Sequence, residues 1–216
     1  MRNKRRLTAM LLAGCLAVSS VPVALAEDAP ERQEQVADQA REDSKAAAPT
    51  EGTCGEDVSW KLENGTLTIS GTGAMKDYTY DDLAPWNGSE KDIKTAVIES
   101  GVTSIGSSAF SGCSNMTQVS LTDSLKNIGQ SAFNECSNLK EISIPNGITD
   151  IYSWTFNNCS NLERVTISNG VKSIGQGAFM SCSALKNISL PDGFENIGRD
   201  AFKDCSALEN ILLPNS

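Results

Sequence analysis

Five cysteines recur at one fixed spacing, and thiols offer the widest chemistry of any residue type in this chain. Each follows the last by 23 residues: Cys113, Cys136, Cys159, Cys182 and Cys205. Thiols can pair as disulfides in a secreted protein, hold a metal ion or act as nucleophiles. The chain contains no histidine, which excludes Cys-His and Ser-His-Asp mechanisms and histidine-based zinc sites.

The same period runs through other columns of residues, so the cysteines belong to a repeating fold. A phenylalanine stands three residues before each cysteine, and an isoleucine stands eight residues before it. A fixed period in the 20s predicts a stacked solenoid, in which residues of one slot form a column about 5 Å apart. We therefore predict buried thiols that act as small apolar residues, with a disulfide as the alternative. A line of parallel thiols is no tetrahedral site, so we expect neither metal nor cofactor.

Each 23-residue unit predicts the same local structure. The alternation of Ile142 and Ile144 is typical of a half-buried strand, and Asn146-Gly147 supplies a turn. A second extended piece follows, and the spacing of Ala132, Phe133 and Cys136 then suits one helical turn. The predicted fold is an α/β-type repeat solenoid over residues 91–216, with one degenerate and five regular units. The degenerate unit holds Asn87 and Glu90 in its Phe and Cys slots.

The region before the repeats divides into three predicted segments. Residues 1–26 have a basic start, an apolar stretch and a small-x-small end, which predicts a signal peptide cleaved after Ala26. Leu12-Ala13-Gly14-Cys15 resembles a bacterial lipobox, so a lipid anchor at Cys15 is the alternative. The acidic residues 27–52 predict a disordered spacer. Alternating runs around Asn64-Gly65 predict a β-hairpin, and we assign 53–90 to an N-terminal β cap and connector.

Composition excludes several classes of function. Removing residues 1–26 leaves 14 (18 − 4) Lys plus Arg against 27 Asp plus Glu, a net charge of −13. Such a surface disfavours nucleic acid, and no second apolar stretch is long enough to span a membrane. We expect that the protein is not an enzyme. The remaining catalytic option is a carboxylate pair among Asp77, Asp81 and Asp82, which could suit a sugar, although a solvated acidic loop is favoured.

The outward strand positions form the candidate binding face, because the repeat leaves them free. Trp154 stands in a slot otherwise held by Ser, Gly or Asp, and either anchors a ligand or packs beside Tyr152. A column that alternates in sign, from Lys140 and Glu163 to Lys186 and Glu209, predicts an ion ladder between neighbouring strands. The candidate binding residues are Gln118, Ser120, Glu141, Ser143, Trp154, Arg164, Thr166, Asn187 and Ser189.

The units at Ile174–Pro191 and Ile197–Pro214 resemble the BspA-like leucine-rich repeats. The resemblance implies a right-handed solenoid with its main strands in one parallel sheet, in a secreted or cell-surface protein. Members of that family bind host matrix proteins or other cells, so we expect adhesion through a protein ligand. The alternatives are a structural module of a longer surface protein, whose activity lies in a further C-terminal domain, and a carbohydrate-binding protein. The apolar strand Ile211–Leu213 also predicts end-to-end self-association.

Overall fold

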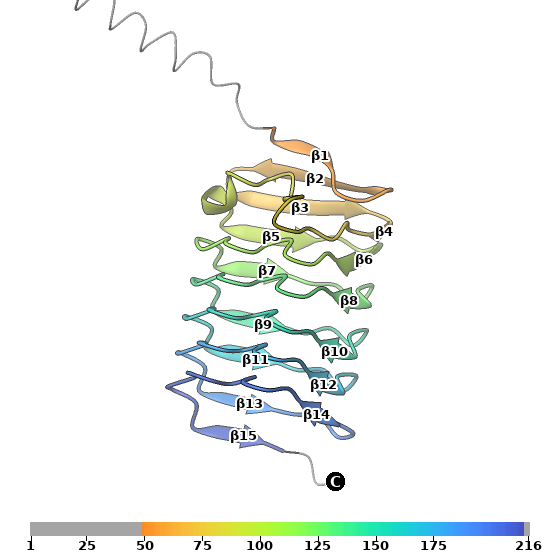
Figure 1. Ribbon diagram of the computed structural model, residues 1–216. Helices are drawn as coiled ribbons and strands as arrows, with labels where there is room; N and C mark the ends of the chain where they lie inside the picture. Colours follow the sequence, from red (N-terminus) through yellow and green to blue (C-terminus); the bar gives the residue numbers. More distant parts are fainter. Residues whose placement is uncertain (1–48, 214–216) are drawn as a thin grey trace, which may run out of the picture. The chain divides into compact units, whose positions relative to one another are not determined.

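The computed structural model describes residues 49–213, and these residues form a parallel β-solenoid (Figure 1). Each 23-residue coil contributes one strand to a main ladder, a corner, a shorter strand to a second ladder, and a set of turns that leads to the next coil. The predicted signal peptide, Cys15 and most of the predicted spacer lie outside the described residues.

The main ladder consists of three-to-six-residue strands with one face inward. Its first sheet has the order β1-β2-β3-β5-β7, and its second has the order β15-β13-β11-β9. In β9, β11 and β13 the middle residue is buried and its two neighbours are exposed, as the predicted alternation requires. The bounds are β1 Glu51–Thr53, β2 Val58–Glu63, β3 Thr66–Gly71, β5 Thr95–Ile98, β7 Gln118–Ser120, β9 Glu141–Ser143, β11 Arg164–Thr166, β13 Asn187–Ser189 and β15 Asn210–Leu212.

The second ladder runs along another side of the stack and also forms two sheets. Their orders are β4-β6-β8 and β10-β12-β14, with register partners one period apart, such as Ile151 and Ile174. The isoleucines of β6, β8, β10 and β12 are buried in the core, whereas β4 has no isoleucine and Ile197 of β14 is exposed. The bounds are β4 Gly73–Ala74, β6 Val102–Ile105, β8 Asn127–Ile128, β10 Asp150–Ile151, β12 Ser173–Ile174 and β14 Asn196–Ile197.

The predicted hairpin is present and continues into the solenoid. Strands β2 and β3 pair antiparallel around Asn64 and Gly65, whose φ angles of 50° and 80° suit a tight hairpin turn. Strand β3 then pairs in parallel with β5, with Leu67 beside Ala96. The capping role of the hairpin stays a prediction. Strand β1 starts at Glu51, two residues inside the segment predicted as spacer.

The expectation of short helical turns is wrong. Within the described residues the only helix is the 3-10 segment η1 at Glu90–Asp92, outside the regular repeats. The N–H of Ala132 bonds within its own turn to Gly129 O, but the N–H of Phe133 bonds to Thr155 O in the next coil. Ser131 has a φ of 56°, outside the right-handed helical region. Because alternate amides serve the neighbouring coil, an α-helical ladder cannot form.

A stack of phenylalanines fills the core beside the turns. Phe110, Phe133, Phe156, Phe179 and Phe202 stack in sequence, with centroids 5.2–5.5 Å apart and rings within 13° of parallel. In the degenerate unit, Asn87 stands where the other units have phenylalanine, which suggested that this unit contributes no ring to the stack. The unit does contribute one. Trp86 takes the place, 5.7 Å from Phe110, and its indole Nε1 donates to Ala109 O at 2.9 Å. One continuous apolar core follows from this stack.

Candidate functional site

The outward face of the main ladder is polar and exposed, as the sequence predicts. Among the candidate binding residues, all those on β7, β9, β11 and β13 are exposed. Arg164 Nη2 lies 2.6 Å from Glu141 Oε2 across neighbouring strands, and the hydrogen bond and charge of Glu141 raise the pKa of Arg164. Asn210 Nδ2 donates to Asn187 Oδ1 at 3.3 Å in the same way. The side chains of this face therefore pair laterally, one period apart.

The predicted ion ladder of Lys140, Glu163, Lys186 and Glu209 is wrong. None of these side chains forms an ion pair within the described part of the chain. Their column is joined by the backbone instead, since Glu163 N–H donates to Lys140 O at 2.9 Å. The cross-strand ion pair belongs to the next column, at Glu141 and Arg164. Sequence spacing identified the period of the charges but not which side chains would converge.

The thiol column lies inside the core, which confirms the predicted burial. Cys113, Cys136, Cys159 and Cys182 are completely inaccessible to solvent, and Cys205 is partly buried. Each thiol from Cys136 onward donates to the carbonyl of a phenylalanine in the preceding coil, as Cys159 Sγ does to Phe133 O at 3.2 Å. Burial raises the pKa of Cys159 to about 12, and that of Cys113 likewise. Such thiols are poor nucleophiles at neutral pH.

The predicted carboxylate cluster is divided among structural contacts. Asp77 Oδ1 accepts a hydrogen bond from Ser107 N–H at 2.7 Å, which ties the loop to the first coil. Asp82 Oδ2 lies 2.6 Å from Lys76 Nζ. Tyr78 is buried, whereas Tyr80 is almost fully exposed. With Asp77 and Asp82 already paired in this way, the arrangement does not support a catalytic carboxylate pair.

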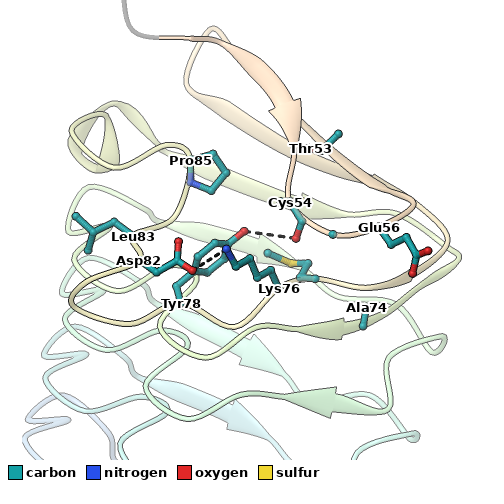
Figure 2. Close-up of a pocket in the computed structure, with 11 residues that line it drawn as sticks. Thr53, Cys54, Glu56, Ala74, Lys76, Tyr78, Asp82, Leu83 and Pro85 are labelled. Carbon is teal, nitrogen blue, oxygen red and sulfur yellow. Dashed lines mark hydrogen bonds and ion pairs between the residues drawn. The ribbon is translucent and has the colours of Figure 1, made fainter.

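A cavity of about 500 Å³ opens between the start of the hairpin and the loop after β4 (Figure 2). Figure 2 shows the Lys76–Asp82 ion pair beside it and Tyr78, whose hydroxyl donates to Cys54 O at 3.4 Å. Burial raises the pKa of Cys54 to about 12. The volume lies in the range of small-molecule sites. No sequence pattern indicated this cavity, since its walls come from two separate segments, residues 53–56 and 74–85.

Trp154 differs from the other candidate binding residues, because it does not lie on the strand face. It sits on the turns with a φ of 61° and is half-buried. Its indole lies over Gly177 in the next coil, where an added Cβ would be 2.6 Å from Cζ3. Tyr152, in a slot otherwise held by glycine, is 45% exposed. Of the two sequence interpretations for Trp154, the geometry favours packing, against the next coil.

The repeat architecture decides the family of this chain. The model of the BspA type leucine-rich repeat region matches six copies over residues 89–216, more than half of the chain. The chain belongs to the BspA-type leucine-rich repeat family. The predicted resemblance is thereby confirmed, and the fold is a parallel-strand β-solenoid rather than a mixture of strands and helices.

Solved bacterial leucine-rich repeat proteins share the fold of this BspA-type chain. The T. pallidum leucine-rich repeat protein is 27% identical with a TM-score of 0.55, over 74% of this chain and 70% of that one. A Bacteroides ovatus leucine-rich repeat protein is 29% identical with a TM-score of 0.55, over 74% of this chain and 40% of that one. A leucine-rich cell surface protein from Faecalibacterium prausnitzii is 24% identical with a TM-score of 0.51, covering 76% and 55%. No curated protein matches the chain.

Residues 49–213 contain no cluster of three or more cysteines, aspartates or glutamates that could hold a metal ion. Over the same range, no helix combines the length and the apolar character needed to cross a bilayer.

Proposed function

We propose that this BspA-type protein binds a protein ligand across the outward face of its main ladder, as an adhesin at a bacterial surface. The observation that carries the proposal is the register of that face. Exposed polar side chains stand at matched positions on β9, β11 and β13, while the thiols are buried. A regular, extended surface of this kind suits recognition of a large partner.

Arg164 is the residue most suited to be the centre of such an interface. Its side chain is largely exposed, and its guanidinium is oriented by Glu141. Arginine is enriched among residues that dominate binding energy, whereas the serines and threonines around it contribute less. The surrounding face is polar and has no aromatic on β9, β11 or β13, which favours a partner with a polar, hydrogen-bonding surface, such as a host matrix protein.

A binding assay with a matched control tests this proposal. The full chain is assayed against purified matrix proteins and intact bacterial cells, followed by Arg164→Ala and by Lys172→Ala. Lys172 also pairs with a carboxylate one period away, Glu195, at 3.5 Å, but it precedes the second ladder and not the main one. We expect Arg164→Ala to weaken binding at least tenfold and Lys172→Ala to leave it unchanged. No binding at micromolar concentration, or equal losses for both variants, would refute the proposal.

The proposed location at the cell surface has its own test. Amino-terminal sequencing of the exported protein should begin at Glu27 if the signal peptide is cleaved after Ala26. A lipid on Cys15 would instead keep the protein in the membrane fraction, and Cys15→Ser would release it. Retention of residues 1–26 in a cytoplasmic protein would contradict both routes.

The apolar end of the stack supports a second proposal about partners, end-to-end association. Ile197, Ile211 and Leu213 are exposed, whereas the same slots one coil earlier hold the buried Ile174, Ile188 and Leu190. A second copy could cover these side chains, and so could further coils of a longer surface protein. Sedimentation separates the outcomes: a monomer at high concentration contradicts self-association. An in-frame genomic continuation past Ser216 would favour the longer protein.

A further inference from the structure

One junction between coils differs from all others along the stack. We call it the seam: the junction between the coil that carries β7 and β8 and the coil that carries β9 and β10. Within the described residues, no β-bridge joins β7 to β9 or β8 to β10. Every other junction between β5 and β13 is bridged in both ladders. The junction from β13 to β15 is bridged in the main ladder, and the described residues contain no second-ladder strand after β14. Both sheets therefore end at the same level of the solenoid, which can be followed in Figure 1.

Tyr152 supplies a physical cause for the seam. The slot just after the second-ladder strand holds Gly106, Gly129, Gly175 and Gly198 in the other coils. An added Cβ at Gly129 would lie 2.4 Å from Ser107 N, and one at Gly175 would lie 2.6 Å from Ser153 N. Each of these glycines thus lies against the backbone of the preceding coil. Tyr152 brings a Cβ to the same place, so its coil cannot approach Gly129 and Gln130 as closely.

The backbone hydrogen bonds show the consequence. Gly129 N–H donates to Ile105 O at 2.9 Å, Gly175 N–H to Ile151 O at 2.7 Å, and Gly198 N–H to Ile174 O at 2.7 Å. In the part of the chain that the structure describes, Tyr152 N–H makes no corresponding bond to Ile128 O. Gly106 also makes no such bond within the described residues, but the segment before it is the irregular loop after β4. Among the slots that follow a regular coil, the bond is missing at Tyr152, where the slot carries a side chain.

The burial of the neighbouring strand agrees with a loosened junction. Val119, at the end of the first main sheet, is only half-buried although coils lie on both sides of it. Its equivalent in the next coil, Ile142, is 3% exposed. Leu121 is half-buried as well, but so is Ile167 in the same slot of a bridged coil, so that slot does not distinguish the seam. Solvent therefore reaches the inward-facing Val119 on the main-ladder side of the seam.

The turn side of the seam stays closed. Phe133 N–H donates to Thr155 O at 2.9 Å, and Glu135 N–H to Asn157 O at 2.8 Å. Phe133 and Phe156 keep their stacking at 5.5 Å. The corner between the ladders also keeps a close contact, since an added Cβ at Gly147 would lie 2.0 Å from Leu125 O. The junction is continuous on one side and broken at both strands.

We propose that the seam is the bending point of the solenoid and that Tyr152 creates it. The coils up to β8 and those from β9 onward act as two stiffer blocks, which pivot about the phenylalanine stack and the turn-side hydrogen bonds. Bending there changes the angle between the outward residues of β7 and those of β9.

Amide hydrogen exchange of the full chain tests the cause. We expect Tyr152 N–H to exchange at least about tenfold faster than Gly129 N–H and Gly175 N–H, since it lacks their hydrogen bond. Tyr152→Gly should slow exchange at position 152 to the rate of the other glycines. Tyr152→Ala is the matched control: it keeps the Cβ and should stay fast. Equal protection in the native protein, or equal rescue by Ala and Gly, would overturn the assignment.

Spin labels on the outward faces of the two blocks test the bending itself. Labels on Lys61→Cys in β2 and Ser189→Cys in β13 span the seam. Both are introduced together with Cys15→Ser and Cys205→Ser, because Cys205 is only partly buried, and the other thiols of the column are buried and should stay unlabelled. We expect a broad distance distribution in this doubly labelled protein and after adding Tyr152→Ala, and a narrower one after adding Tyr152→Gly. Distributions of equal width in all three proteins would refute a bending point at the seam.

Discussion

The indole of Trp154 and the backbone of Gly177 occupy adjacent coils and fit only as a pair. Position 177 belongs to a slot in which each of the five regular coils has a positive φ, from Ser108 at 54° to Asp200 at 57°. Serine and aspartate are accepted in that slot, so backbone conformation alone does not require glycine at 177. The requirement comes from the ring above it, since an added Cβ would meet Cζ3 at 2.6 Å.

Gly177→Ala should therefore displace the Trp154 ring. A positive φ alone costs an alanine about 1 kcal/mol, and the clash adds to that cost. We expect a loss of unfolding free energy of about 2 kcal/mol and a red shift of tryptophan fluorescence. The control is a double-mutant cycle with Trp154→Ser, in which the ring is absent and only the backbone cost should remain. Additive effects of the two substitutions would show that the ring and the glycine are independent.

The stability lost when one phenylalanine of the stack is replaced by alanine should depend on the position of that residue in the stack. Phe156 is fully buried between two other rings, so Phe156→Ala should cost about 3–5 kcal/mol of unfolding free energy. Phe202 contacts one ring of the stack and is partly exposed, so Phe202→Ala should cost clearly less. Denaturant unfolding measures both values, and equal losses would contradict a core that is tightest at its centre.

Alkaline pH should destabilise the protein through its buried thiols. Burial raises the pKa of Cys159 from 9.0 to about 12, so the folded state holds a proton that the unfolded state releases. The stability from this thiol is fully present below pH 9 and is lost as the pH rises toward 12. Unfolding free energies measured across that window should fall with pH, and less steeply in Cys159→Val. An unchanged slope would show that this thiol does not contribute.

The same burial predicts how the thiols react. At pH 8, without reductant, a thiol-specific reagent should leave Cys113, Cys136, Cys159 and Cys182 unmodified in the native protein, because they are inaccessible and protonated. In denaturant all four should react at once. Failure to react in denaturant would indicate disulfides and contradict a column of thiols.

In the acidic loop after β4, Asp77 should contribute to stability and Asp81 should not. Asp77→Ala removes the acceptor for Ser107 N–H and should lower the unfolding free energy by about 0.5–1.5 kcal/mol. Asp81→Ala, in the same exposed loop, should leave it unchanged within measurement error. Loss of glycan binding in Asp81→Ala, with unchanged stability, would revive a carbohydrate-binding role.

Period and alternation in the chain were enough to predict the solenoid, the strand slots and the buried columns. They succeed because a slot repeated every 23 residues must meet the same neighbours in every coil, so the Phe, Cys and Ile columns report one environment many times over. The hairpin at Asn64 and Gly65 was predictable for a different reason, since its turn chemistry is local. The helical turns were predicted wrongly because their amides bond to the next coil, and no local pattern reveals that.

The tertiary structure alone decided how the irregular positions are used. Trp86 replaces the missing phenylalanine from a neighbouring slot, because space in the core and not sequence register determines which ring stacks on Phe110. Glu141 and Arg164 converge while the alternating column of Lys140 and Glu163 does not, since side-chain direction on the strand decides which charges meet. Tyr152 was visible in the sequence as a departure from glycine. Its effect on both sheets became evident only once the preceding coil was seen to lie against that slot.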